Sequence, residues 1–145
     1  MIIQEKLILL CIDSEKLRYI ESLTIKSYPS ECCGLLVGTD SPEKRVVEVC
    51  PVPNRNFERA HDRFVIERCD FEKVDKKATK NGLQIIGVYH SHPDHPAVPS
   101  QYDADHACSW FSYIIVAVEK GEKTNVKSWV FREEGKQFEE EEIKS

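Results

Sequence analysis

The sequence lacks the features that would assign it to a membrane, a nucleic acid or a secretory route. Its longest apolar runs are far too short to span a bilayer. It has neither a basic run nor a basic amphipathic helix, and its net charge is −5. Residues 1–12 are apolar but contain Glu5 and Lys6, without the basic start or small-residue cleavage site of a signal peptide. We therefore expect a cytoplasmic protein with no nucleic-acid partner and no membrane partner.

The sequence also lacks a CxxC pair, although it contains six cysteines. In a chain without a secretion signal, such cysteines are expected to be buried, reduced thiols. Cys32 and Cys33 are adjacent, and no neighbouring feature activates either of them as a nucleophile. The cysteines therefore predict packing rather than chemistry.

The 145 residues, 41% of them hydrophobic and 31% charged, have the size and composition of one globular domain covering residues 1–145. The apolar patterns predict an α/β fold. Short or alternating apolar runs indicate strands in residues 1–12 and at 33–38, 45–52, 64–66, 83–89, 113–118, 126–131 and 137–143, and helices are expected at 14–27, 70–80 and 100–110. The acidic residues 139–142 are expected to form a solvated edge.

The most informative stretch begins where the strand at 83–89 ends. His90 and His92 are at positions i and i+2, so their side chains point to the same side of an extended chain. Three prolines between residues 93 and 99 then bend the chain back. Ser100 is a good helix N-cap, and Asp103 falls three residues later, as in a capping box with Asp in place of Glu. Each feature alone would more often be a surface pair or a cap, but together they match a three-ligand catalytic zinc site.

Glu31 is the other candidate, at the junction between the first helix and the strand at 33–38. A lone acid there would normally be an exposed loop residue. A zinc hydrolase, however, needs a base that takes a proton from water. Glu31 is therefore a candidate for that base.

These residues resemble a known signature. Glu31, the sequence His90-Ser91-His92, Ser100 and Asp103 match the JAMM (MPN+) metalloprotease pattern, and the flanking residues 31–38 and 86–93 look like its small prokaryotic branch. The resemblance covers about residues 29–118. It implies a single-domain MPN fold, a curved mixed β-sheet flanked by helices and similar to cytidine deaminases. The deaminase signature itself, HxE with PCxxC, is absent.

The resemblance also implies roles for these residues. His90, His92 and Asp103 would bind one Zn²⁺ per chain, Glu31 would deprotonate the attacking water and then protonate the leaving amine, and Ser100 would donate to the oxyanion. The expected reaction is hydrolysis of a peptide or isopeptide bond that follows the C-terminal Gly-Gly tail of a ubiquitin-like or sulfur-carrier protein. The tail is expected to bind as a strand at an exposed edge, with residues 54–62 as one possible wall.

The number of residues between the signature and the next strand limits the class of substrate. Eukaryotic, chain-specific relatives carry an insertion after the zinc aspartate, and the short interval from Asp103 to Tyr113 leaves no room for one. That favours a sulfur-carrier substrate. Two alternatives stay open: a different mononuclear metalloenzyme, such as a cupin-like oxygenase, and a non-catalytic MPN scaffold. Cupins place a glutamate soon after HxH, which this chain lacks, and scaffolds typically lose ligands that this chain keeps.

Overall fold

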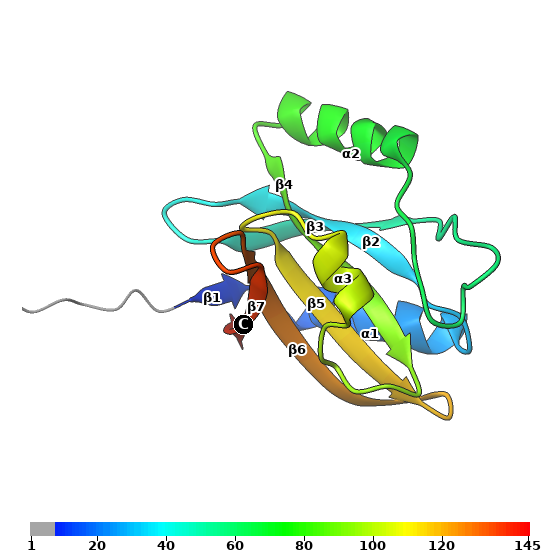
Figure 1. The fold of residues 1–145 in the computed structure, drawn as a ribbon. Coiled ribbons are helices and arrows are strands. Elements are labelled where there is room, and N and C mark those ends of the chain that lie inside the picture. The colour runs from blue at the N-terminus through cyan, green and yellow to red at the C-terminus, as the bar shows by residue number, and fades with distance from the viewer. Residues whose placement is uncertain (1–7) are drawn as a thin grey trace, which may run out of the picture.

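The computed structural model describes residues 8–145, in which seven strands and three helices follow one another (Figure 1). In chain order they are β1 (Leu9–Cys11), α1 (Ser14–Ser27), β2 (Cys33–Thr39), β3 (Arg45–Val52), α2 (Arg68–Lys80), β4 (Gln84–Pro93), α3 (Gln101–Asp105), β5 (Ser112–Glu119), β6 (Glu122–Arg132) and β7 (Gln137–Lys144). No helix among these residues has the length and apolar content needed to cross a membrane.

The strands form one closed, mixed sheet in the order β1-β3-β2-β4-β5-β6-β7. Strand β4 lies in its middle, antiparallel to β2 and parallel to β5. The expected curved mixed sheet is thereby confirmed. Gly87 allows β4 and β5 to approach closely, because a Cβ there would lie 2.2 Å from the Ser112 carbonyl oxygen.

Alternate residues of the central strands enter two different cores. Leu36 packs with Ile20 of α1 in the core on one face. Leu35 packs with Ala78 of α2 in the core on the other face. Helix α1 begins as expected, since the Asp13 carboxylate accepts a 2.9 Å hydrogen bond from the Lys16 amide. The two longer helices therefore cover opposite faces of the sheet.

Five expectations differ from the structure at element boundaries. One is β6, which begins at Glu122, four residues before the expected start at 126. Strand β4 continues to Pro93, four residues beyond the predicted end at 89, because β5 pairs with it as far as Pro93, whereas β2 pairs with it only as far as His90. The helix expected at 100–110 ends at Asp105. Residues 64–66 have no partner strand among the described residues, so they are not a strand. Of the strand expected within residues 1–12, β1 covers Leu9–Cys11, and residues 1–7 lie outside the described part.

The acidic end is not a solvated edge. Strand β7 pairs with β6 on one side and with β1 on the other, so it has neighbours along both sides. Glu141 is buried there, and the Ser128 hydroxyl donates a 2.7 Å hydrogen bond to its carboxylate. The prediction for residues 139–142 is therefore wrong at Glu141.

Candidate active site

Strand β4 brings the two histidines together on one face of the sheet. Their Nε2 atoms lie 3.1 Å apart, and both rings are buried. The i, i+2 spacing predicted this arrangement, because side chains alternate between faces along a strand. The ring nitrogens thus converge on one point.

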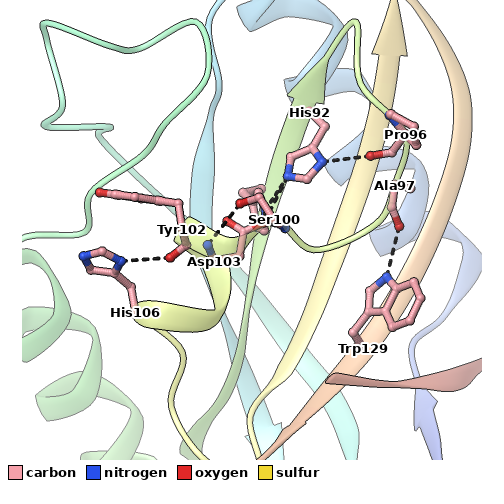
Figure 2. A network of polar contacts seen from close by, with 9 residues as sticks. His92, Pro96, Ala97, Ser100, Tyr102, Asp103, His106 and Trp129 are labelled. Atoms are coloured by element: carbon pink, nitrogen blue, oxygen red, sulfur yellow. Dashed lines mark hydrogen bonds and ion pairs between the residues drawn. The ribbon is translucent and has the colours of Figure 1, made fainter. Parts of the chain in front are cut away.

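Asp103 reaches the same point from α3. The Ser100 hydroxyl accepts from the Asp103 amide at 3.1 Å, and the Ser100 amide donates to Asp103 Oδ2 at 2.9 Å, which completes the predicted capping box. The cap turns the carboxylate toward the histidines. Asp103 Oδ2 lies 3.2 Å from His92 Nε2 and 3.4 Å from His90 Nε2. Figure 2 shows Ser100, Asp103 and His92 in this network.

Strand pairing explains how Glu31 joins residues 59 positions away (90 − 31 = 59). Strands β2 and β4 pair with Cys33 opposite His90, and extending this antiparallel register by two residues places Glu31 opposite His92. Ser91 holds the junction, since its hydroxyl accepts from the Cys32 amide at 2.9 Å and its amide donates to the Cys32 carbonyl at 3.1 Å. Glu31 is buried and only 5% exposed.

Burial and neighbouring charges perturb every titratable group of the site. Burial raises the pKa of the Glu31 carboxyl to about 8, against a smaller opposing effect of His92. Burial also opposes ionisation of Asp103, yet His90, His92 and the Ser100 amide together hold the pKa of that carboxyl far below its usual range. Full burial lowers the pKa of His90. Strongly perturbed groups of this kind are typical of functional sites.

Two sets of side chains here could hold a metal ion. Ligand atoms of Glu31, His90 and His92 all lie within 4.8 Å of one another. The set that contains Asp103 in place of Glu31 is tighter, with separations of 3.1, 3.2 and 3.4 Å between the three ligand atoms. A tetrahedral ion with bonds of about 2.0–2.1 Å separates its ligands by roughly 3.3 Å. The separations in the Asp103 set fit that geometry. Glu31 then lies beside the ion without being one of its three ligands.

The sequence suggested residues 54–62 only as a possible wall, and it gave no role to two residues that hold the site, Phe64 and Asn54. The Phe64 ring stacks on the His90 ring, with centroids 4.5 Å apart. The Asn54 side chain makes four hydrogen bonds: it donates to the carbonyls of Glu31 and Arg63 and accepts from the amides of Asn56 and Val65. The amide of Glu31 also donates to the carbonyl of Ala60 at 2.5 Å. The loop that follows β3 therefore forms a wall of the site. A single sequence cannot distinguish an asparagine that makes four hydrogen bonds from an ordinary loop residue.

A cavity of about 340 Å³ adjoins this wall. Its lining is mainly apolar and includes Phe64, which stands between the cavity and His90. Across it, Tyr102 of α3 lies under the Arg63 guanidinium, 4.6 Å from ring centroid to carbon. The site thus opens beside an apolar hollow between the loop and α3.

The adjacent cysteines are unsuited to nucleophilic catalysis. Burial raises the pKa of the Cys33 thiol to about 12 and also raises that of Cys32. All six cysteines lie in the described residues and are free thiols. Cys11 and Cys33 are buried as expected and Cys32 and Cys50 are half-buried, but Cys69 and Cys108 are exposed, so the prediction of buried thiols is wrong for these two.

Comparisons with known proteins identify the family of this chain. Residues 17–132 match the family model of prokaryotic homologs of the JAB domain. A desampylase from Pyrococcus furiosus is 30% identical over 77% of this chain and 74% of its own length. A probable TtuB-protein conjugate cleaving protease from Thermus thermophilus is 28% identical over 66% of this chain and 61% of its own.

The fold is also similar to that of a solved structure from the same family. A JAB1/MPN domain protein from Archaeoglobus fulgidus superimposes with a TM-score of 0.57 at 18% identity, covering 96% of this chain and 99% of that one. Such low identity speaks for the fold alone, but the family model spans most of the sequence. The match favours the metalloprotease interpretation over a cupin-like oxygenase. This chain belongs to the JAMM/MPN family, among the prokaryotic homologs of the JAB domain.

Proposed function

We propose that this protein is a zinc-dependent hydrolase that cleaves the peptide or isopeptide bond after the C-terminal Gly-Gly tail of a ubiquitin-like or sulfur-carrier protein. The observation that carries the proposal is the triangle of His90 Nε2, His92 Nε2 and Asp103 Oδ2, with a buried carboxyl beside it. The desampylase and conjugate-cleaving relatives support the choice of substrate.

His90, His92 and Asp103 are the proposed ligands, and two imidazoles with one carboxylate suit zinc. Zinc, when bound, polarises the scissile carbonyl and makes water a better nucleophile at neutral pH. Three protein ligands leave the fourth position for the reactants. Asp103 is ionised and the burial of His90 favours its neutral form, which is the protonation state that ligands require.

Glu31 is proposed as the base that takes the proton from water and then gives it to the leaving amine. Burial already places the pKa of its carboxyl at about 8. A nearby cation favours the carboxylate and lowers this pKa toward neutrality, where proton transfer in both directions is efficient. The Glu31 main chain is held by Asn54 and Ala60, so the carboxyl is presented from a fixed backbone.

Ser100 is proposed as the donor to the oxyanion. Its oxygen accepts from the Asp103 amide, so its hydroxyl hydrogen is free to point at a substrate oxygen. A donor fixed before the reaction costs little reorganisation as charge develops. The capping geometry that orients Asp103 therefore also orients Ser100.

The substrate tail is proposed to pair with residues 63–67. Strand β4 pairs with β5 as far as Pro93 and with β2 as far as His90, and the Ser91 amide bonds to the Cys32 carbonyl, so little of its edge is left for the tail. The carbonyls of Arg63 and Val65 and the Val65 amide all bond toward residues 54–55. In the described chain, the main-chain groups of Phe64 and Ile66 have no hydrogen-bond partner. A segment whose main chain is bonded along one side only has a free edge that is a template for strand addition.

The short link between α3 and β5 supports a site for a small substrate. Helix α3 ends at Asp105 and β5 begins at Ser112, so no inserted domain separates them. This favours a sulfur-carrier tail, as the sequence suggested. The free thiols suit a reducing compartment, and we place the proposed activity in the cytoplasm.

The proposal predicts that the zinc-loaded protein cleaves fusions placed after a Gly-Gly end. A panel should join ubiquitin-like and sulfur-carrier domains, each ending in Gly-Gly, to one reporter peptide, and mass spectrometry should locate the cut. Cleavage is expected to stop with a chelator and to return with added zinc. Matched fusions ending in Ala-Ala should remain intact. A zinc-loaded protein that cuts none of the Gly-Gly fusions would favour the non-catalytic scaffold.

Strand addition predicts an alternating effect of tail N-methylation. Methylating the tail amide that faces the Phe64 or Ile66 carbonyl removes a hydrogen bond worth about 1 kcal/mol and adds a clash, so KM should rise roughly tenfold with little change in kcat. Methylating the adjacent amide, which points away, should leave KM unchanged. Steady-state kinetics on a series of singly methylated tails measures both. Equal effects at neighbouring positions would contradict strand pairing.

A further inference from the structure

The loop from Asp94 to Pro99, which joins β4 to α3, is fixed to the rest of the fold at two points, Asp94 and Ala97. At its start, the Asp94 carboxylate accepts from the Tyr28 hydroxyl at 2.7 Å and from the Lys120 amide at 2.9 Å. Further along, the carbonyl of Ala97 accepts from the indole Nε1 of Trp129 at 3.0 Å. Trp129 belongs to β6, and Figure 2 shows its ring directed at this loop.

The same loop orients one histidine. His92 Nδ1 lies 2.8 Å from the carbonyl oxygen of Pro96, which can only accept, so Nδ1 must carry the hydrogen. In a neutral ring that leaves the lone pair on Nε2, the atom that faces Asp103 Oδ2. The carbonyls of Pro96 and Ala97 come from consecutive residues. A donor that fixes the Ala97 carbonyl therefore also limits where the Pro96 carbonyl can point.

The partner histidine has no comparable bond. His90 Nδ1 is buried without a hydrogen-bond partner among the described residues, and the Phe64 ring covers the imidazole. His90 is held by packing, whereas His92 is held by a main-chain acceptor on a loop. The orientation of His92 thus depends on what fixes that loop.

We propose that Trp129 is a positioning residue that, through the Ala97 and Pro96 carbonyls, holds His92 as the Nδ1–H tautomer with Nε2 directed at the metal. The inference rests on the proposed role of His92 as a ligand. Trp129 touches neither the ligand atoms nor the attacking water in this arrangement. Its effect is on metal affinity, since partners that orient ligating histidines change that affinity by about 10–100-fold.

Trp129→Phe tests the proposal, because phenylalanine keeps an aromatic ring against Ala97 and Ile115 but cannot donate. The matched control is Trp110→Phe, which changes the other tryptophan; its side chain is 58% exposed and lies beside Arg132. Zinc affinity, measured by competition with a chromogenic chelator, is expected to fall about tenfold or more in Trp129→Phe and to stay at the wild-type value in Trp110→Phe.

A second readout is independent of both zinc and peptidase activity. In the metal-free protein, the ¹⁵N shifts of the His92 ring report the tautomer, and Trp129→Phe should increase the Nε2–H population. If Trp129→Phe fails to fold, β-benzothienylalanine at position 129 in the Trp110→Phe background replaces the N–H by sulfur with the ring shape kept. Wild-type zinc affinity together with unchanged His92 shifts in the variant that folds would overturn the proposal. If Trp129→Phe binds zinc more weakly but the wild-type protein cleaves no tail, only the proposed function is contradicted.

Discussion

Replacing Glu31 by glutamine is expected to leave zinc bound and to lower the rate of tail hydrolysis by about 10²–10⁴-fold, the usual contribution of a positioned general base. Glutamine keeps the size and the main-chain bonds of the buried residue but can neither take a proton from water nor return it to the leaving amine. Single-turnover rates on a Gly-Gly fusion, measured beside the zinc content of the same sample, give both quantities.

Glu15→Gln is a suitable control, because it removes the same charge from an exposed residue in the first turn of α1, a helix that carries none of the proposed site residues. It should cleave at the wild-type rate. If Glu31→Gln cleaved as fast as the wild type while holding one zinc, the base would have to be another group. Loss of zinc in that variant would instead point to Glu31 as a ligand.

Glu31→Gln is also expected to change the stability of the metal-free protein. The carboxyl of Glu31 has a pKa of about 8 when folded and 4.5 when exposed. Between these values the folded state binds more protons than the unfolded state, so this residue makes the free energy of unfolding fall as pH rises. Glutamine has no such titration. Glu31→Gln should therefore become more stable than the wild type across this window, by a few kcal/mol at its upper end, as chemical denaturation at several pH values would show.

Local spacing predicted the parts of the site that neighbouring residues determine. The histidines share a face because of strand periodicity, and Ser100 and Asp103 form a capping box because of helix geometry. The end of β4 was misplaced for an equally local reason. His90, Ser91 and His92 are polar, which favours a loop, yet all three pair with β5, and His90 also pairs with β2.

Pairing between distant strands determines the structure of the segments that the sequence did not predict. Residues 64–66 have the composition of a strand, but no strand of the described chain lies beside them. Glu141 belongs to an acidic run, and only the pairing of β7 with β1 removes the edge it was expected to occupy. The contact of Phe64 with His90 likewise joins distant residues, and no local pattern predicts it.

Asp103→Ala is expected to lose stoichiometric zinc, because it removes one of three proposed ligands. Structural zinc sites with four ligands bind with about 10–16 kcal/mol, so one ligand is worth roughly 3–4 kcal/mol, or about 10²–10³-fold in affinity. The change also removes the acceptor of the Ser100 amide, at a cost of about 1 kcal/mol in the free energy of unfolding. Metal analysis after dialysis and thermal melts of the metal-free proteins measure the two effects separately.

Two variants separate the ligand from the cap. Asp105→Ala removes an exposed acid of the same helix, bonded only to Gln101, and should bind zinc normally. Asp103→Asn keeps an acceptor for the Ser100 amide but is neutral, so it should restore the stability and not the zinc. The two possible ligand sets share the histidines and differ in their carboxylate. Zinc retained by Asp103→Ala but lost by Glu31→Ala would therefore assign the third ligand to Glu31, and the base would have to come from elsewhere.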